Sequence, residues 1–289
     1  MSISEGLGPK RFVDLPQGRI EFRESGTGEP IVFVHGVLVN GDIWRNVAPT
    51  LAQRYRCIVP DWPLGSHSVP MRRDADLTTP GLADLVVSFL DALDLTRATL
   101  VGNDTGGAVC QLVVHRHPHR IERLVLASCD AYEVYPPRVY FFLPWAGRLP
   151  GVLALLSHTL RFAWMRNSPI SFPMVAATRP PQPISDSYVT PGYRRAIRRD
   201  TRKVLGTTTN RDTLTAAKAF CAFDRPVLVA WAEDDKIFPQ RLADRLASDF
   251  PNARRVGVPR SRTFIGEDQP TVLADLVATF MEQPATSRP

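Results

Sequence analysis

One aspartate stands where a side chain could react with a substrate. Asp104 follows the β-type run 98–101 and precedes an apolar helical pattern that begins at Thr105. Gly102 and Gly106 flank it, and small residues there let a strand and a helix meet in a sharp turn that pushes the central side chain outward. An aspartate at such a nucleophile elbow cannot perform serine esterase chemistry, but it can attack an sp³ carbon and form an alkyl ester. The alternative is that Asp104 only caps the following helix.

Other side chains capable of chemistry also follow β-type runs. They are His35, Asp61, Asp130 and Asp235. In an open parallel sheet the reactive groups gather at the carboxyl ends of the strands. The sequence therefore predicts that these residues lie at the same edge of a sheet as Asp104.

The elements that must position these residues alternate between strand and helix. We expect strands at 11–15, 19–24, 31–34, 56–60, 98–101, 121–128, 226–231 and 253–258, and helices at 43–55, 82–95, 105–116, 240–249 and 270–281. The first two strands are short and separated by a turn, which predicts an antiparallel edge. The rest predict an α/β fold with a mostly parallel sheet of roughly eight strands flanked by helices.

Between residues 131 and 225 the alternation stops, and prolines, aromatics and helical patches dominate. We interpret this region as an inserted helical cap over 132–215, with the core formed by 1–131 and 216–289. Residues 282–289 are predicted to be a disordered tail.

Composition excludes several classes of protein. The net charge is +6, and the densest basic group is Arg194, Arg195, Arg198, Arg199, Arg202 and Lys203, which we interpret as a solvated helix face because no nucleic-acid motif accompanies it. No stretch has the length of a membrane span and no signal peptide is visible, so we expect a cytoplasmic protein with no nucleic-acid or membrane partner. The four cysteines show no metal-ligand spacing and are predicted to be buried free thiols. We expect no metal and no cofactor.

With these residues in place, the chain resembles the α/β-hydrolase superfamily, especially the haloalkane dehalogenases and epoxide hydrolases that use an aspartate nucleophile. The matching segments are Val-His-Gly at 34–36, Asp61 with Gly65 and Ser68, the turn at 102–106, and Trp-Ala-Glu-Asp-Asp-Lys-Ile-Phe-Pro at 231–239. The resemblance implies an α/β-hydrolase fold with Asp104 as the nucleophile. It also implies that the backbone N–H groups of Val37 and Thr105 form an oxyanion hole, and that Asp235 orients a histidine.

That histidine is missing. The family usually has it in the loop before the last helix, followed by Phe, an acidic residue and Pro, whereas this loop reads Thr263, Phe264, Ile265 and onward to Pro270. Thr263 stands in its place, and a threonine cannot accept a proton near pH 7. The residues that serve a halide in the dehalogenases are also replaced, by Val37 and Thr105, so we do not expect a halide site.

Two substitutes for the missing base remain open. His67 lies in the loop after Asp61, at the correct edge of the sheet. Alternatively, Asp104, Asp130 and Asp234 or Asp235 share one cavity, and then at least one carboxyl keeps its proton at neutral pH and provides an acid and base pair. The alternative to a chemical role is that Asp130 and Asp234 cap helices or face solvent.

The cap is rich in aromatic residues of the kind that line apolar substrate cavities. They are Tyr132, Tyr135, Tyr140, Phe141, Phe142, Trp145, Phe162, Trp164 and Phe172. We expect Tyr132, Tyr135, Phe141, Trp145 and Trp164, together with His35 and Asn103 of the core, to contact a hydrophobic substrate.

The sequence thus predicts an enzyme, monomeric or homodimeric, that acts on a hydrophobic small molecule through Asp104. The reaction is hydrolysis of an epoxide, an ester or a related bond, or a rearrangement, elimination or cyclisation in which Asp104 transfers a proton. The alternative is a binding protein that retains the fold without the chemistry.

Overall fold

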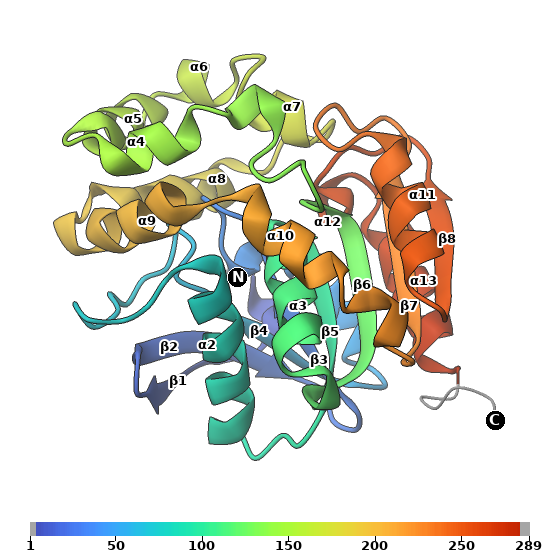
Figure 1. The fold of residues 1–289 in the computed structure, drawn as a ribbon. Helices are drawn as coiled ribbons and strands as arrows, with labels where there is room; N and C mark the ends of the chain where they lie inside the picture. The colour runs from blue at the N-terminus through green and yellow to red at the C-terminus, as the bar shows by residue number, and fades with distance from the viewer. Residues whose placement is uncertain (1–3, 284–289) are drawn as a thin grey trace.

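The centre of the molecule is an eight-stranded sheet with the order β1-β2-β4-β3-β5-β6-β7-β8 (Figure 1). The computed structural model describes residues 4–283 of the chain. Strands β1 and β2 pair antiparallel, as do β2 and β4, and every other neighbouring pair is parallel. The strands are β1 (Lys10–Leu15), β2 (Gly18–Ser25), β3 (Pro30–Val34), β4 (Arg56–Pro60), β5 (Ala98–Asp104), β6 (Ile121–Cys129), β7 (Val227–Ala232) and β8 (Ala253–Val258). The predicted fold class, including the antiparallel edge, is confirmed.

Helices cover both faces of the sheet, and each face has its own hydrophobic core. One core packs helices α2 (Thr79–Ala92), α3 (Thr105–Arg116), α10 (Asn210–Ala217) and α11 (Gln240–Asp249) on the sheet. The other packs α1 (Ala48–Leu51), α12 (Ile265–Asp268) and α13 (Pro270–Met281). The central strands are therefore buried on both sides, which explains their continuous apolar runs.

The long helix predicted at 43–55 is wrong. The segment forms a 3₁₀ helix, η2 (Gly41–Trp44), and then the short helix α1. Pro49 lies in the first turn of α1, where its missing N–H is tolerated, whereas in the interior of a longer helix it would remove a hydrogen bond and clash with the preceding turn. The loop before η2 thereby stays free to approach the end of β5.

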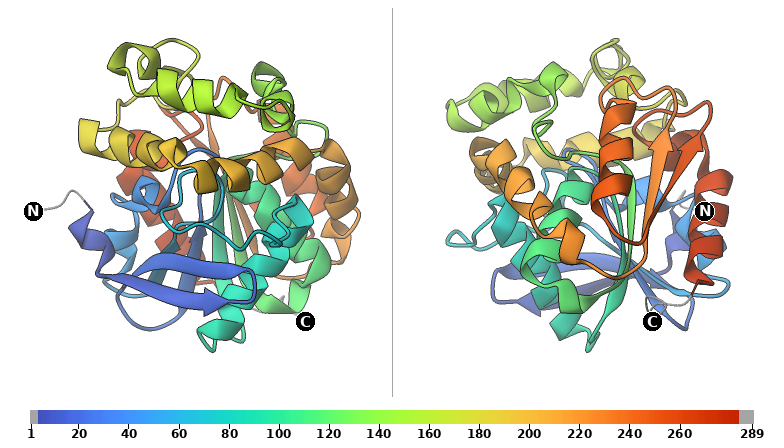
Figure 2. Two further views of the ribbon diagram at one scale, coloured as in Figure 1. Left: turned by 90° about the vertical axis from the view of Figure 1, so that its left-hand side faces the viewer. Right: turned by 45° about the vertical axis from the view of Figure 1, so that its right-hand side comes forward.

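The cap lies over the carboxyl ends of the strands (Figures 1 and 2). It consists of α4 (Leu143–Arg148), α5 (Val152–Leu160), α6 (Ala163–Arg166), α7 (Phe172–Val175), α8 (Gln182–Val189) and α9 (Arg195–Thr207). Short 3₁₀ helices occur at η1 (Glu5–Leu7), η3 (Pro118–Arg120), η4 (Arg138–Tyr140), η5 (Thr190–Tyr193) and η6 (Phe220–Ala222). The predicted boundary at residue 215 falls within α10, which packs against α3 of the core.

The structure corrects the prediction for one cysteine and describes only part of the predicted tail. Cys57, Cys110 and Cys129 are buried, but Cys221 is exposed, because its neighbour Phe220 occupies the core in its place. Of the predicted tail, residues 284–289 lie outside the described part of the chain. Gln283 is described, and its carbonyl accepts hydrogen bonds from Arg123. Within residues 4–283 we find no helix with the length and apolarity needed to cross a bilayer.

Candidate active site

The backbone at Asp104 has the strained geometry of a nucleophile elbow. Asp104 ends β5 with φ 53° and ψ −131°, a positive φ that is uncommon outside glycine. A Cβ at Gly106 would lie 2.1 Å from the carbonyl oxygen of Val34, and one at Gly102 would lie 2.8 Å from the carbonyl oxygen of Gly106. Glycine is therefore required on both sides of the turn. The Asp104 side chain makes no helix-capping hydrogen bond, so it is not held as an ordinary N-cap residue.

The Asp104 carboxyl faces two backbone donors. The N–H groups of Thr105 and Val37 both donate to it, as expected of an oxyanion hole. The loop can come this close because residue 36 is glycine: a Cβ there would lie 2.1 Å from Asp104 Oδ2. Burial, aided by the negative charge of Asp235, nevertheless raises the pKa of Asp104 to about 7.

His35 positions this loop and does not contact the cavity. Its Nε2 accepts a hydrogen bond from the backbone N–H of Trp62 at 2.8 Å, so Nδ1 carries the proton and donates to the Gly36 carbonyl, also at 2.8 Å. Burial lowers the pKa of His35 to about 4, which keeps the ring neutral. The residue therefore fixes the loop that carries the Val37 donor.

Asp130, at the end of β6, is the second carboxyl of the site. Thr105 Oγ1 donates to its Oδ2 at 3.1 Å, while Oδ1 is buried without a hydrogen-bond partner among the described residues. Burial and the charge of Asp104 raise the pKa of Asp130 well above its ordinary value. A neutral Asp130 can therefore present an O–H through Oδ1 while Oδ2 accepts from Thr105.

Thr263 occupies the position facing Asp235. Its Oγ1 donates to Asp235 Oδ1 at 3.0 Å, and the backbone N–H groups of Ile237 and Phe238 donate to the same oxygen. Asp235 Oδ2 is buried and has no partner in the described structure. Burial raises the pKa of Asp235 as well. Asp235, the acid that would orient a histidine, is thus present, and it accepts a hydrogen bond from a threonine instead.

Asn103 fixes the Thr263 loop. Its Nδ2 donates to the backbone carbonyl of Thr263 and to that of Ala127, both at 2.7 Å. It therefore ties the loop to the ends of β5 and β6, and it does not line the cavity as a substrate contact.

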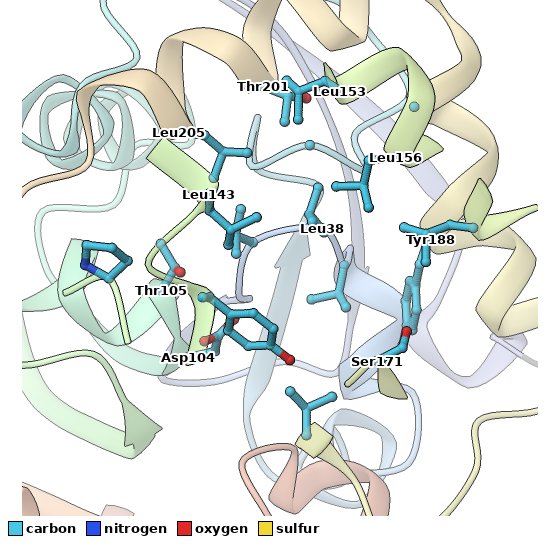
Figure 3. Close-up of a pocket in the computed structure, with 18 of the residues that line it drawn as sticks. Leu38, Asp104, Thr105, Leu143, Leu153, Leu156, Ser171, Tyr188, Thr201 and Leu205 are labelled. Atoms are coloured by element: carbon cyan, nitrogen blue, oxygen red, sulfur yellow. The ribbon is translucent and has the colours of Figure 1, made fainter. Parts of the chain in front are cut away.

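Asp104, Thr105 and Asp130 line an apolar cavity of about 220 Å³. Figure 3 shows Asp104 and Thr105 in its wall. Leucines form much of its wall, from the core loop and from three helices of the cap: Leu38, Leu143, Leu153, Leu156 and Leu205. No histidine is among its lining residues within the described chain. The same part of the chain contains no group of three or more His, Cys, Asp or Glu arranged to hold a metal ion. The site therefore offers carboxyl groups and backbone donors to an apolar ligand.

Comparisons with known proteins agree with this geometry. Residues 29–270 match the alpha/beta hydrolase fold family. The chain belongs to that family. It is 26% identical over 271 residues to haloalkane dehalogenase 2 of Mycobacterium tuberculosis, covering 91% of this chain and 92% of that protein. It is 38% identical over 111 residues to 2-hydroxymuconate semialdehyde hydrolase of a Pseudomonas species, covering 37% of this chain and 39% of the relative. Among solved structures, the epoxide hydrolase CorEH superposes with a TM-score of 0.79 at 20% identity, covering 94% and 98% of the two chains. These similarities support an enzyme of the α/β-hydrolase fold that is similar to a haloalkane dehalogenase in sequence and to an epoxide hydrolase in fold.

Several aromatic residues of this α/β hydrolase lie elsewhere than the sequence predicts. Tyr135 lines the cavity, but Phe141, Trp145 and Trp164 are exposed, because the outer surfaces of the cap helices carry them. Tyr132 is buried in the core, where its hydroxyl donates to Asp249 at 2.9 Å. The aromatic rings found in the cavity wall include Tyr140, Phe142, Phe172, Tyr188 and Phe264.

The missed apolar contacts of the hydrolase come mainly from α5. Leu153, Leu156 and Leu160 line the cavity, and their spacing of three and four residues is the signal that predicts one face of a helix. An aromatic count alone does not detect such a stripe.

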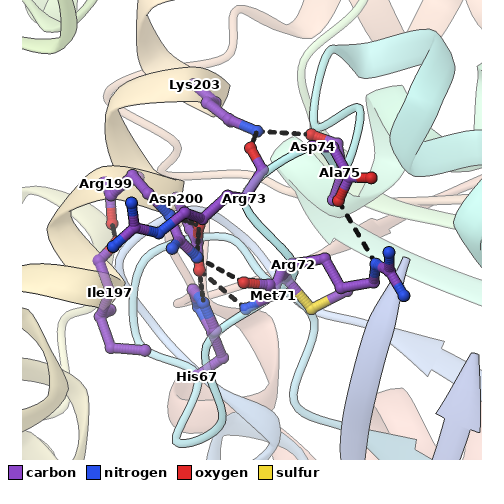
Figure 4. Close-up of polar contacts among 11 residues, drawn as sticks. His67, Met71, Arg72, Arg73, Asp74, Ala75, Ile197, Arg199, Asp200 and Lys203 are labelled. Carbon is purple, nitrogen blue, oxygen red and sulfur yellow. Dashed lines mark hydrogen bonds and ion pairs between the residues drawn. The ribbon is translucent and has the colours of Figure 1, made fainter. Parts of the chain in front are cut away.

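His67 is not brought to Asp104. It is buried away from the cavity lining, and its Nε2 lies 3.3 Å from Oδ2 of Asp200 on α9 (Figure 4). The same oxygen accepts from the backbone N–H of Met71 at 2.9 Å, and Arg199 Nε donates to Oδ1 at 2.8 Å. His67 therefore belongs to the junction between the cap and the loop after β4. Asp234 is also outside the site, because it is exposed.

The basic group of α9 is only in part a solvated face, because Arg195 and Arg202 are exposed whereas other members contact the core. Arg194 donates to the Ser68 carbonyl, and Arg199 donates to the Met71 carbonyl. Lys203 Nζ donates to the carbonyls of Arg73 and Ala75, each at 2.7 Å. A loop of the core supplies backbone acceptors opposite this helix, so its charges hold the cap on the core (Figure 4).

Proposed function

We propose that this α/β hydrolase uses Asp104 and Asp130 as a base and acid pair to open a C–O bond, foremost that of an epoxide, in a hydrophobic small molecule. The observation that carries the proposal is that two carboxyls, Asp104 and Asp130, line one cavity whose lining includes no histidine among the described residues. No cofactor is needed for this chemistry. The resemblance to an epoxide hydrolase fold supports the choice of bond.

The two carboxyls have complementary protonation. A pKa of about 7 leaves Asp104 substantially ionised at neutral pH, so it can accept a proton, which suits a general base best near the working pH. Asp130 keeps its proton because burial and the Asp104 charge disfavour a second anion. The site thus contains one proton acceptor and one proton donor without imidazole.

The reaction is a single displacement. Asp104 takes a proton from water, or from a hydroxyl of the substrate itself, and the oxygen so activated attacks one epoxide carbon. The C–O bond at that carbon breaks, and Asp130 delivers its proton to the leaving oxygen. Proton transfer from Asp104 back to Asp130 restores the site. Water gives a diol and an internal hydroxyl gives a cyclic ether.

A covalent route is disfavoured by Thr263. An ester at Asp104 would require a base to activate the water that cleaves it, and the group facing Asp235 in this structure is a threonine hydroxyl. The family's nucleophilic use of the aspartate therefore predicts an ester that accumulates, whereas the base and acid pair predicts turnover.

The test is a panel of aryl and alkyl epoxides, esters and haloalkanes in ¹⁸O water, under single-turnover conditions and with intact-mass spectrometry. We expect epoxide opening with solvent oxygen in the first product formed and no lasting adduct. An adduct on Asp104, or product oxygen taken from its carboxyl, would establish nucleophilic attack instead. If nothing turns over and Asp104→Asn leaves ligand affinity unchanged, the chain is a binding protein.

A further inference from the structure

Large apolar side chains gather on the outer layer of the cap. Thirteen of them are exposed in the described part of the chain, and nine of these lie between residues 139 and 170. They are Val139, Phe141, Phe142, Trp145, Leu149, Leu155, Phe162, Trp164 and Ile170, which we call the cap patch. Figures 1 and 2 show that this segment, with α4, α5 and α6, forms the layer of the cap farthest from the sheet. An apolar patch of this kind marks an interaction surface.

The charges around the cap patch have a single sign. Residues 134–185 contain no Asp or Glu, but they contain Arg138, Arg148, Arg161, Arg166 and Arg179. Arg166 is buried and paired with Asp186, whereas Arg138, Arg148 and Arg161 are exposed and form no ion pair with any described residue. Arg161 instead lies 4.7 Å above the ring of Phe162. The patch thus combines exposed aromatics with uncompensated positive charge.

The cap segment has two apolar faces. Leu153, Leu156 and Met165 line the cavity, whereas Leu155 and Trp164 of the same helices are exposed on the other side. Ile170 does both, since it lines the cavity and is 66% exposed. Ile170 therefore belongs to both the cavity wall and the cap patch.

We propose that the cap patch docks on the surface of an anionic lipid bilayer. Tryptophan, phenylalanine and leucine side chains bury favourably at the boundary between head groups and acyl chains, and arginines are attracted to anionic head groups. A second copy of the chain fits less well, because a two-fold contact would place two acid-free, arginine-bearing surfaces against each other. This proposal departs from the expectation of no membrane partner, which rests on the lack of a spanning segment; surface docking needs no such segment.

Docking would bring Ile170, a residue of the cavity wall, against the lipid. Passage of a hydrophobic substrate from the bilayer past Ile170 into the cavity is a consequence that rests on the proposed function, whereas the docking itself does not.

Flotation of the full-length protein with vesicles tests the docking without any activity measurement. The probes are phosphatidylcholine vesicles and vesicles with about 30 mol% phosphatidylglycerol. We expect binding that is stronger on the anionic vesicles and weakens with added salt. The triple variant Phe141→Ser, Trp145→Ser, Trp164→Ser should lose at least about 10-fold in binding, since each ring contributes buried apolar area. Phe12→Ser removes an exposed aromatic of β1, far from the cap, and serves as the matched control.

A second variant set keeps the aromatic surface. Arg138→Gln with Arg161→Gln should weaken binding to anionic vesicles by about 5-fold for each arginine and leave binding to neutral vesicles unchanged. Arg54→Gln with Arg97→Gln, on the core, should change neither. Failure of the wild type to float with either vesicle would overturn the proposal. So would a dimer in sedimentation velocity that the triple variant abolishes, without vesicle binding.

Discussion

Asp104 and Asp200 are both carboxyls covered by the cap, Asp104 half-buried in the wall of the cavity and Asp200 fully buried in the junction with the core, yet their surroundings differ in charge. Burial alone would raise the pKa of Asp200, but hydrogen bonds from His67, the Met71 backbone and Arg199 hold that pKa below its ordinary value. Asp104 has two backbone donors and no cation, and its nearest charged neighbours are other carboxyls, so its pKa rises to about 7. The same residue type is thus stabilised as an anion in one place and destabilised in the other.

The contrast separates a structural role from a chemical one. A compensated carboxyl such as Asp200 orders its neighbours and has little tendency to exchange protons near pH 7. An uncompensated carboxyl such as Asp104 costs stability, and a fold retains such a group where proton transfer is required. Substitution of Asp104 should therefore act mainly on activity, and substitution of Asp200 mainly on stability.

The largest expected effect is on activity at Asp104. Asp104→Asn should lower kcat/KM for the epoxide by about 10³-fold or more, because the amide cannot accept the proton. Initial rates of the purified wild type and variant measure this loss. Circular dichroism checks that the variant is folded. Asp200→Asn is the matched control and should keep most of its activity per folded molecule. Equal losses of activity in the two variants would contradict the assignment of a chemical role to Asp104 and a structural role to Asp200.

An effect of comparable size and opposite direction is expected from Thr263→His. The unpartnered Asp235 Oδ2 can accept a hydrogen bond from the imidazole Nδ1–H, which would hold the ring in its useful tautomer beside Asp104. Ester or haloalkane hydrolysis should rise by about 10²-fold to 10⁴-fold, the contribution of a positioned base. Native epoxide opening should fall, since a nearby imidazolium favours ionised carboxyls.

Rates for Thr263→His and for its double variant with Asp104→Asn measure this gain. If hydrolysis rises equally in both, Asp104 is not the nucleophile of the new reaction. If the ring is placed correctly in a crystal structure and nothing rises, the remainder of the site has diverged from the hydrolytic arrangement as well.

Asp200→Asn should act mainly on stability. Removing the anion leaves His67 and Arg199 without their partner in a buried junction, for which we expect a loss of about 3 kcal/mol in the free energy of unfolding. Urea unfolding at pH 7 measures it. Asp74→Asn, which affects an exposed pair with Arg72, should cost less than about 1 kcal/mol and is the control.

The sequence predicts the elbow and the missing histidine because both depend on short, local patterns. Gly102, Asp104 and Gly106 define a turn by their spacing, and Thr263 is recognised by its place in a loop. The role of His67 depends on how the loop after β4 meets α9, a helix more than a hundred residues later, and no local pattern encodes that contact. For the same reason the arginines of α9 resemble a solvated face in sequence.

The orientation of cap aromatics is similarly a tertiary property. Phe141 and Phe142 are neighbours in sequence, but only Phe142 lines the cavity, since the packing of α4 on α9 decides which ring turns inward. Strand and helix periodicity predicts most of the core, whereas cap helices as short as α6 and α7, with four residues each, have too few turns to define a face.

The smallest expected effect is the pH dependence of stability at Asp104, and its sign differs from that at Asp200. The folded state raises the pKa of Asp104 from 3.8 to about 7, so between these values the folded protein binds more protons than the unfolded chain. Stability contributed by this group is complete below about pH 4 and is lost as the pH rises through about 7. Asp104→Asn removes the ionisable group, and at pH 8 it should therefore be more stable than the wild type by on the order of 2 kcal/mol. This is less than the about 4 kcal/mol that the full pKa shift represents, because the amide keeps one acceptor for the two backbone donors.

For Asp200 the folded pKa is depressed, and its contribution to stability disappears only as the pH falls below about 4. Thermal unfolding of the wild type and both variants from pH 5 to pH 8 separates these signs. An Asp104→Asn difference that does not grow across that range would mean that Asp104 is ionised throughout, and that its charge is compensated after all.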